Sequence, residues 1–261
     1  MTILDELADF AKARVAAAKK VKSLAEIRRE AQSLGQGNFS FERALSRTKL
    51  SFICECKKAS PSKGLIAPHF PYVSIAQSYV QGGADCISVL TEPKWFLGAD
   101  AYLQEIAKAV DLPCLRKDFT VDEYMLYEAK LLGASAVLLI VSLLSKEQLQ
   151  EYLAICDELG LSALVEAHAE REIEVALGAG ARIIGVNNRN LKDFTVDMNN
   201  SQRLRSLVPK EVLFVVESGI TNHQDVDKAR AMGADGVLIG EALMRSENIA
   251  GALKELREGH D

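Results

Sequence analysis

Four copies of a short motif divide this chain into nearly equal steps, and their spacing limits the folds that are open to it. Gly83-Ala84, Gly133-Ala134, Gly180-Ala181 and Gly233-Ala234 are each followed by one polar residue and a short apolar run. The steps are 50, 47 and 53 residues (133−83, 180−133 and 233−180). Glycine suits the left-handed residue that ends a helix, and the apolar run suits a following strand. The motif therefore predicts evenly spaced helix-to-strand junctions.

Short apolar runs alternate with amphipathic segments from residue 50 onward, and each motif precedes an even-numbered run. Eight strands, each followed by a helix, predict an α/β protein of the (βα)8 TIM-barrel class, and 261 residues suit a fold that typically takes about 250. The expected helix N-caps are Thr120, Ser145 and the pair Thr221-Asn222. Strands are expected at 50–56, 85–90, 112–117, 136–141, 162–166, 182–187, 212–217 and 236–240, and helices at 72–82, 100–110, 121–132, 145–159, 169–179, 199–207, 222–232 and 248–258.

The segment before the first expected strand is helical in character. Residues 2–34 are rich in Ala, Leu, Lys and Glu, and their apolar residues recur at helical spacing. The chain contains no linker and no low-complexity stretch. We therefore expect one domain over residues 1–261, with a helical extension at 1–48 and the barrel at 49–261.

Charge and cysteine usage limit the partners and the compartment. The formal net charge of −5 argues against a general nucleic-acid-binding or membrane-binding surface. No segment reaches the roughly 18 uninterrupted apolar residues of a membrane span, and the early residues Asp5 and Glu6 are acidic where a secretory signal is basic. The five cysteines form no Cys-x-x-Cys pair, and the four histidines have no metal-ligand spacing. We expect a cytoplasmic protein with reduced cysteines and no metal, nucleic-acid or membrane partner.

The predicted strands end in charged and amide side chains. Because side chains alternate along a strand, Ile53, Glu55 and Lys57 share one face, while Cys54 and Cys56 share the other. Burying charge at the end of an apolar strand has a cost that packing alone does not explain. The active sites of such barrels lie at the C-terminal ends of the strands. The polar residues at these ends are Glu55, Lys57, Lys117, Glu166, Asn187, Arg189 and Glu217.

Two turns and one loop indicate an anionic ligand. Ser218-Gly219 and Gly240-Glu241 each precede an expected helix, where backbone N–H groups bind phosphate in many barrels. The loop from Ser60 to Gly64 adds hydroxyl and amine donors. The alternatives are two ordinary turn glycines and an exposed basic turn. The two glycine turns together favour a phosphate site.

Lys57, Lys117 and Glu166 indicate acid–base chemistry on a small phosphorylated substrate. A lysine beside another lysine is expected to have a lowered pKa, which would make it a usable acid. The alternatives are a rim network of ion pairs, a Schiff-base lysine in a related isomerase or aldolase, and a sensor built on an inactive barrel. His168 follows Glu166 closely, and a place near the site is the alternative to the solvated loop in which it is expected.

The chain resembles the indole-3-glycerol phosphate synthase family over essentially its whole length. Members close the indole ring of 1-(2-carboxyphenylamino)-1-deoxyribulose 5-phosphate and release carbon dioxide and water, without a metal or organic cofactor. The resemblance implies a carboxy-lyase of tryptophan biosynthesis with one activity. The motifs that carry it are Glu55-x-Lys57-Lys58-Ala59-Ser60-Pro61-Ser62-Lys63-Gly64, Leu115-Arg116-Lys117-Asp118-Phe119, Glu166, Asn187-Asn188-Arg189-Asn190-Leu191, Glu217-Ser218-Gly219-Ile220 and Gly240-Glu241-Ala242-Leu243-Met244.

The resemblance also implies roles for particular residues. Lys117 is implied as the general acid and Glu166 as its carboxylate partner and a base in the dehydration. Lys57 is implied to steer the substrate's carboxylate and phosphate, with Glu55 orienting it, and is a candidate for the second acid. The N-terminal helices are implied to cover the barrel mouth of a protein expected to be a monomer. The implied substrate-binding residues are Asn187, Arg189, Glu217, Ser60, Pro61, Phe96 and Phe119, and the implied phosphate-binding residues are Ser218, Gly219, Gly240 and Glu241.

Overall fold

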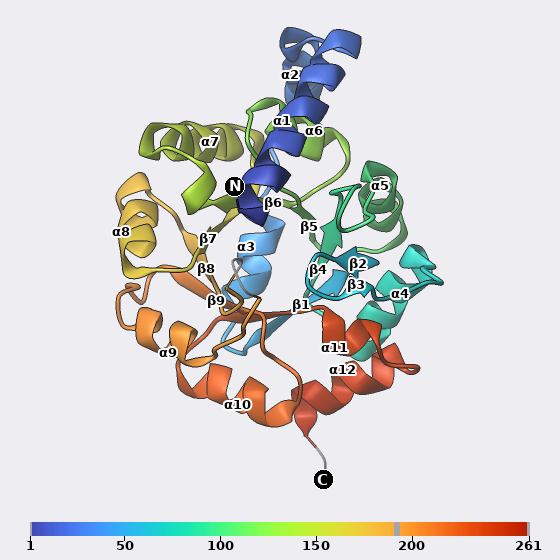
Figure 1. Cartoon of the computed structure of the whole chain (residues 1–261), viewed down its shortest axis with the longest axis vertical. Helices are drawn as coiled ribbons and strands as arrows, with labels where there is room; N and C mark the ends of the chain where they lie inside the picture. Colours follow the sequence, from blue (N-terminus) through green and yellow to red (C-terminus); the bar gives the residue numbers. More distant parts are fainter. Residues whose placement is uncertain (1, 191–193, 260–261) are drawn as a thin grey trace.

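Eight parallel strands close into a barrel in the computed structural model, which describes residues 2–190 and 194–259 (Figure 1). Leu191 of the sequence motif lies outside the described residues. Each strand pairs in parallel with both neighbours, and the first pairs with the last, so the predicted TIM barrel is confirmed. The barrel strands are β1 (Ser51–Cys56), β4 (Cys86–Leu90), β5 (Cys114–Lys117), β6 (Ala136–Ile140), β7 (Ser162–Ala167), β8 (Ile183–Asn187), β9 (Leu213–Glu217) and β10 (Gly236–Ile239).

A ring of helices surrounds the barrel, close to the expected ranges. A hairpin of β2 (Ala59–Ser60) and β3 (Gly64–Leu65) and the short helix α11 (Glu241–Met244) were not predicted. Both lie in connections at the C-terminal ends of the strands. The other helices outside the barrel are α4 (Tyr72–Gly82), α5 (Asp100–Ala109), α6 (Tyr124–Leu131), α7 (Lys146–Leu159), α8 (Glu170–Ala179), α9 (Asn199–Arg205), α10 (His223–Ala231) and α12 (Ile249–Glu258), and the 3-10 turn η1 spans Val141–Leu143.

Two of the three predicted caps are confirmed. The Ser145 side chain accepts from the Gln148 N–H at the start of α7, and Asn222 accepts from the Asp225 N–H at the start of α10. The prediction for Thr120 is wrong, because α6 begins only at Tyr124 and its cap has no side-chain hydrogen bond. Residues 121–123 instead lie outside the helix, with a bend at Asp122 and a turn at Glu123.

The Gly-Ala motif has the backbone geometry that its glycine predicted. Gly83, Gly133, Gly180 and Gly233 have φ angles of 88°, 86°, 93° and 75°. A residue with a side chain is disfavoured there, since its Cβ crowds the following carbonyl. Each glycine thus ends a helix and redirects the chain into an even-numbered barrel strand.

The strands separate two apolar regions. Ile53, Leu115 and Leu164 point into the barrel, whereas Cys54 and Cys56 pack outward against the helices, as alternation predicts. The same alternation brings the polar residues at the strand ends to the upper end of the barrel interior.

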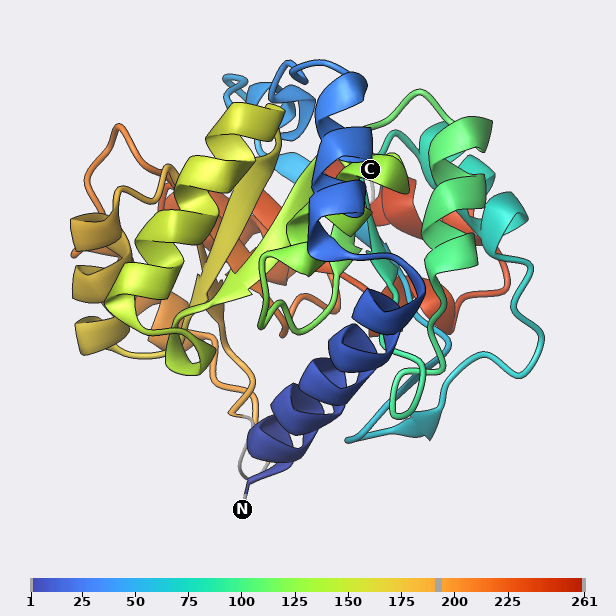
Figure 2. The ribbon, with the colours of Figure 1, turned by 90° about the horizontal axis from the view of Figure 1, so that it is seen from above.

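The N-terminal extension contributes a helix at each end of the barrel. Helix α1 (Ile3–Val21) crosses the mouth, with its N-terminus over the ring of strands (Figure 1). Helix α2 (Leu24–Ser33) follows after a break capped by Ser23, and α3 (Ser40–Leu45) lies at the opposite end (Figure 2). The longest of these, α1 with 19 residues, bears charges at both ends, and no helix in the described residues meets the length and apolarity of a membrane span.

Candidate active site

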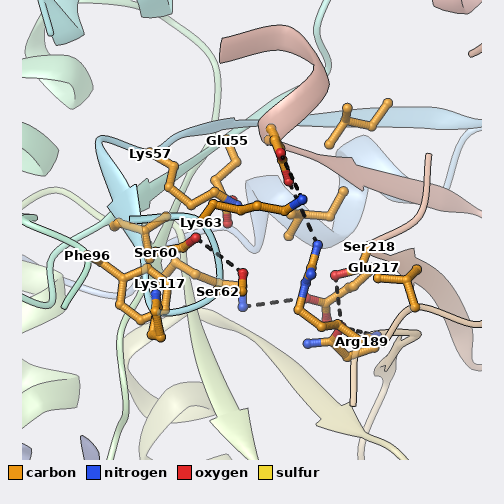
Figure 3. Close-up of a pocket in the computed structure, with 18 of the residues that line it drawn as sticks. Glu55, Lys57, Ser60, Ser62, Lys63, Phe96, Lys117, Arg189, Glu217 and Ser218 are labelled. Atoms are coloured by element: carbon orange, nitrogen blue, oxygen red, sulfur yellow. Dashed lines mark hydrogen bonds and ion pairs between the residues drawn. The ribbon is translucent and has the colours of Figure 1, made fainter. Parts of the chain in front are cut away.

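A cavity of about 850 Å³ opens at the C-terminal ends of the strands (Figure 3). It is lined by residues of all eight barrel strands, by loops at their C-terminal ends, and by α1. The structure therefore brings together every residue to which the sequence assigned a role, although those roles stay predictions. These residues are Lys117, Glu166, Lys57 and Glu55; Asn187, Arg189, Glu217, Ser60, Pro61, Phe96 and Phe119; and Ser218, Gly219, Gly240 and Glu241.

Lys117 lies between two carboxylates at the centre of the cavity. Its Nζ is 3.2 Å from Glu166 Oε2 and 3.5 Å from Glu217 Oε2. Burial alone would lower the pKa of Lys117, but attraction to Glu166, Glu217 and Glu55 outweighs burial and raises it. The prediction of a lowered lysine pKa is therefore wrong for Lys117, because its close charged neighbours are acidic.

The pKa values of the two carboxylates beside Lys117 are shifted in opposite directions. Burial works against the ionised form of Glu166, but Lys117, His168 and a hydrogen bond from Asn187 together lower its pKa. Burial raises the pKa of Glu217 to about 8, and repulsion from Glu166 adds to the rise. Within residues 2–190 and 194–259, Glu217 Oε1 has no hydrogen-bond partner. The site thus holds an ionised carboxylate and a readily protonated one around one ammonium group.

A second acid–amine pair comes from β1. Lys57 Nζ lies 2.6 Å from Glu55 Oε2, and both side chains are largely buried. This pair needs a glycine beside it, because a Cβ at Gly240 would overlap Glu55 Oε2 and crowd Lys57 Nζ. Gly240 therefore has a packing role in addition to the phosphate role that the sequence suggested.

Asn187 connects the acid–base cluster to the turn after β9. Its Nδ2 donates to Glu166 Oε1 at 3.2 Å, and its Oδ1 accepts from Ser218 Oγ at 2.9 Å and from the Arg189 N–H at 3.0 Å. One amide thereby fixes both a candidate base and a candidate phosphate-binding residue.

The candidate phosphate end is built from tight turns and cations. Ser218 and Gly219 have φ angles of 66° and 92°, so two successive left-handed residues turn the chain. Gly240 is the N-cap of α11, but α10 begins only at His223, so the Gly219 N–H is not at a helix N-terminus as predicted. The Glu241 carboxylate lies 3.1 Å from Arg245, 3.5 Å from Lys63 and 4.0 Å from Arg189.

Several residues at the site were not predicted from the sequence. Ile3 and Leu7 of α1, Phe194 and Val196 of the loop after β8, and Arg245 also line the cavity. In sequence, the α1 residues differ in no way from other apolar positions of an amphipathic helix.

His168 also lies elsewhere than the sequence analysis expected. Only 21% of its side chain is exposed, and its Nε2 lies 3.5 Å from Glu166 Oε1. The expectation of a solvated loop histidine is therefore wrong. Its position two residues after Glu166 was the one available signal.

Comparison with known proteins gives one consistent result. The family model described as indole-3-glycerol phosphate synthase matches residues 4–256. The chain is 54% identical over 256 residues to a protein of that name from Ruminiclostridium cellulolyticum, covering 98% of each chain. It is 53% identical over 257 residues to one from Endomicrobium trichonymphae, covering 98% of this chain and 100% of the relative.

Solved structures with low sequence identity share the fold. The chain is similar to 3-hexulose-6-phosphate synthase from Salmonella typhimurium, with a TM-score of 0.65, 15% identity and coverage of 80% of this chain and 97% of that one. Thiamine phosphate pyrophosphorylase from Pyrococcus furiosus gives a TM-score of 0.60 with 18% identity, covering 84% of this chain and 96% of that one. At such identities the similarity shows the fold alone.

Proposed function

The chain belongs to the indole-3-glycerol phosphate synthase family, and from this premise we propose how the residues of the cavity divide the work of the reaction. The protein is a carboxy-lyase of tryptophan biosynthesis. It converts 1-(2-carboxyphenylamino)-1-deoxyribulose 5-phosphate into indole-3-glycerol phosphate, carbon dioxide and water. A ring carbon of the substrate bonds to the ketone carbon, carbon dioxide leaves, and loss of hydroxide and a proton completes the indole.

Lys117 is the general acid of ring closure in this proposal. The ketone oxygen becomes basic as the ring carbon attacks, and a charged ammonium beside it supplies the proton. The raised pKa of Lys117 supports this role, because it keeps the side chain protonated at neutral pH. An alkoxide binds a proton more strongly than a lysine amine does, so even a tightly held proton is transferred.

Glu166 is the base of the dehydration step. Its lowered pKa keeps it ionised, and it lies 3.2 Å from the Lys117 amine that has just released a proton. Lys57, held by Glu55 at 2.6 Å, orients the substrate carboxylate and is the candidate second acid. Both pairs come from strand ends, which hold reacting groups more precisely than loops do.

The rest of the cavity binds the substrate. Asn187, Arg189 and Glu217 bind the hydroxyl groups and carboxylate of the substrate. Phe96 and Phe119, whose ring centroids are 6.0 Å apart, form the pocket for its aromatic ring. The phosphate is bound by Ser60, by Ser218, and by the N–H groups near Gly219, Gly240 and Glu241.

The cavity also bears on the two alternative functions. A Schiff base requires a neutral amine, which the raised pKa of Lys117 opposes. A sensor on an inactive barrel has no need for an ammonium group 3.2 Å from a buried carboxylate. The acid–base cluster around Lys117 is thus the observation that carries the proposal.

The test is turnover of the purified protein. With the substrate and an excess of chelator, we expect growth of indole fluorescence. Borohydride added during turnover is expected to leave no covalent adduct. An adduct on Lys117 or Lys57 would overturn the acid assignment, and absence of turnover by folded protein that binds substrate would favour the sensor.

The same proposal covers the organisation of the chain. The active unit is one domain of residues 1–261, with the extension at 1–48 and the barrel at 49–261, because α1 side chains line the cavity. A monomer suffices, since one chain supplies all the lining residues named above. The cytoplasm suits its five cysteines, which are all buried free thiols.

A further inference from the structure

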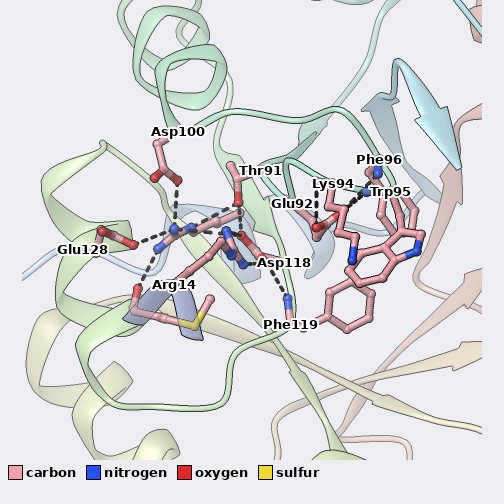
Figure 4. A network of polar contacts seen from close by, with 12 residues as sticks. Arg14, Thr91, Glu92, Lys94, Trp95, Phe96, Asp100, Asp118, Phe119 and Glu128 are labelled. Atoms are coloured by element: carbon pink, nitrogen blue, oxygen red, sulfur yellow. Dashed lines mark hydrogen bonds and ion pairs between the residues drawn. The ribbon is translucent and has the colours of Figure 1, made fainter. Parts of the chain in front are cut away.

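Asp118 follows Lys117 directly, but its carboxylate has contacts of a different kind (Figure 4). Its side chain is fully buried and accepts two hydrogen bonds from Arg14 of α1, at 2.6 and 3.1 Å. Thr91 Oγ1 donates to it at 2.6 Å, and the Phe119 N–H donates at 2.8 Å. Bidentate arginine–carboxylate pairs are among the strongest and most directional polar contacts in proteins.

Helix α1 contributes more than this one arginine to the region. Leu7 and Ala11 pack in the same apolar cluster as Phe119, and Ile3 and Leu7 line the cavity on its apolar side. Lys19, further along the helix, pairs with Asp122 at 2.7 Å. Helix α1 is thus fixed to the connection after β5 by two ion pairs and an apolar contact.

The connection after β4 joins the same assembly. The buried Glu92 carboxylate accepts from the N–H groups of Lys94, Trp95 and Phe96 at 2.7 to 2.9 Å, which fixes the loop that carries Phe96 into the cavity. The Trp95 ring meets the edge of Phe10 of α1, with centroids 5.5 Å apart. Three segments therefore form one wall around Asp118: the start of α1, the loop after β4 and the end of β5.

We propose that the pair Arg14–Asp118 is a positioning pair, which holds α1 against the barrel so that Ile3 and Leu7 complete the apolar wall for the substrate's aromatic ring. This inference rests on the proposed function for the nature of the ring. Among the described residues, Asp118 lines the cavity but Arg14 does not, so Arg14 acts through α1 and Asp118 rather than on the substrate. The pair then governs substrate binding more than the acid–base steps at Lys117.

The chain provides its own reporter of α1. Trp95 is its one tryptophan and packs against Phe10, so its emission without substrate reports whether α1 is docked. In Arg14→Met we expect easier quenching of Trp95 by acrylamide, a KM raised about tenfold, equivalent to about 1.4 kcal/mol of lost binding, and a kcat close to that of the wild type. Lys12→Met is the matched control, because Lys12 lies on the exposed side of α1, where its Nζ pairs with Asp9 at 3.0 Å.

Two further variants keep the test independent of folding. Arg14→Lys retains the charge without the two-nitrogen fork and is expected to give smaller changes of the same kind. In Arg14→Met with Asp118→Asn, the rise in KM is expected to be less than the product of the two single effects, since both remove one contact.

The outcomes separate this inference from the proposed function. Wild-type KM and wild-type Trp95 quenching in Arg14→Met would overturn the inference, as would a lower kcat at unchanged KM, which would make Asp118 a partner of Lys117 chemistry. If neither the wild type nor any of the variants forms the indole product, the proposed function is wrong. Trp95 quenching would still show whether Arg14 holds α1.

Discussion

Arg116 and Lys117 are neighbours on β5, yet their side chains leave the strand on opposite sides and meet carboxylates in different ways. Arg116 points out of the barrel and donates to Thr91 Oγ1, the Met125 carbonyl, Asp100 and Glu128. Lys117 points in, and its Nζ lies 3.2 Å from Glu166 and 3.5 Å from Glu217.

The carboxylates show the same contrast. Asp118, on the outer side, accepts hydrogen bonds from Arg14, Thr91 and the Phe119 N–H, and the positive charges of Arg116 and Arg14 outweigh burial and lower its pKa. Glu217, on the inner side, keeps one buried oxygen without a hydrogen-bond partner among the described residues, and burial raises its pKa to about 8. A buried polar atom without a hydrogen bond destabilises the folded state, so native proteins contain few of them, and those present often have a functional role.

The side chains on the outer face of β5 therefore have a structural role, and those on its inner face have a functional one. Each charged group of the outer cluster has an oppositely charged partner, and among its buried side-chain polar atoms in the described residues Arg14 Nε alone lacks a hydrogen bond. This cluster therefore stabilises the fold and positions α1. The inner cluster retains charged groups and a hydrogen-bond acceptor that are free to interact with a bound substrate.

The sharpest test exchanges the two cations for methionine. Lys117→Met is expected to lower kcat about 10²- to 10⁴-fold, since it removes the general acid. Arg116→Met is expected to keep most of kcat per folded molecule but to lower the free energy of unfolding by about 3 kcal/mol, because it removes a buried guanidinium that donates to the Met125 carbonyl and pairs with the partly exposed carboxylates of Asp100 and Glu128.

Both variants need two measurements, kcat from indole fluorescence and the free energy of unfolding from urea titration. Lys12→Met, an exposed lysine on α1, serves as the control for the substitution itself. The comparison would be broken if Arg116→Met lost as much kcat as Lys117→Met while remaining folded.

A second test uses the pH dependence of stability. Between the usual glutamate pKa of 4.5 and about 8, the folded protein holds a proton on Glu217 that the unfolded chain has released. The free energy of unfolding therefore falls as pH rises through this window, by up to about 1.4 kcal/mol per pH unit. Glu217→Gln is expected to remove that fall.

Urea titrations from about pH 5 to about pH 8 measure the slope directly. Glu241→Gln is the matched control, because Glu241 lines the same cavity but has a lowered pKa and stays ionised throughout. Equal slopes for wild type and Glu217→Gln would show that Glu217 is ionised in the folded protein, and the contrast with Asp118 would then disappear.

The smallest expected effect concerns His168. Burial lowers its pKa, but a hydrogen bond with Glu172 and attraction to Glu166 together raise it. His168→Asn removes one positive neighbour of Glu166, so the pKa of Glu166 rises. The acid limb of the kcat/KM profile is then expected to move to higher pH.

Glu172→Gln refines this prediction, because it weakens the positive charge on His168 but also removes a negative charge near Glu166. These two changes act on the pKa of Glu166 in opposite directions and partly cancel. We expect a shift of the acid limb in the same direction but smaller. An acid limb that stays in place in both variants would mean that His168 packs beside Glu166 without influencing its proton.

Much of the molecule followed from the sequence alone. The four Gly-Ala motifs and the apolar runs placed all eight strands, because glycine at positive φ and strand alternation are local properties of the chain. Lys117, Glu166 and Glu217 could be assigned to one end of the barrel, since parallel strands carry their last residues to the same rim.

The tertiary structure decided what these residues meet. Arg14 and Asp118 are 104 positions apart, and no local pattern pairs them. The direction of the Lys117 pKa shift was predicted wrongly, because it depends on which charges lie within a few ångströms and not on residue type. The cap prediction for Thr120 failed because α6 begins only at Tyr124, and the prediction for His168 failed because its ring packs beside Glu166. A sequence specifies its strands through neighbouring residues, but proton affinities and paired charges arise only when distant segments pack together.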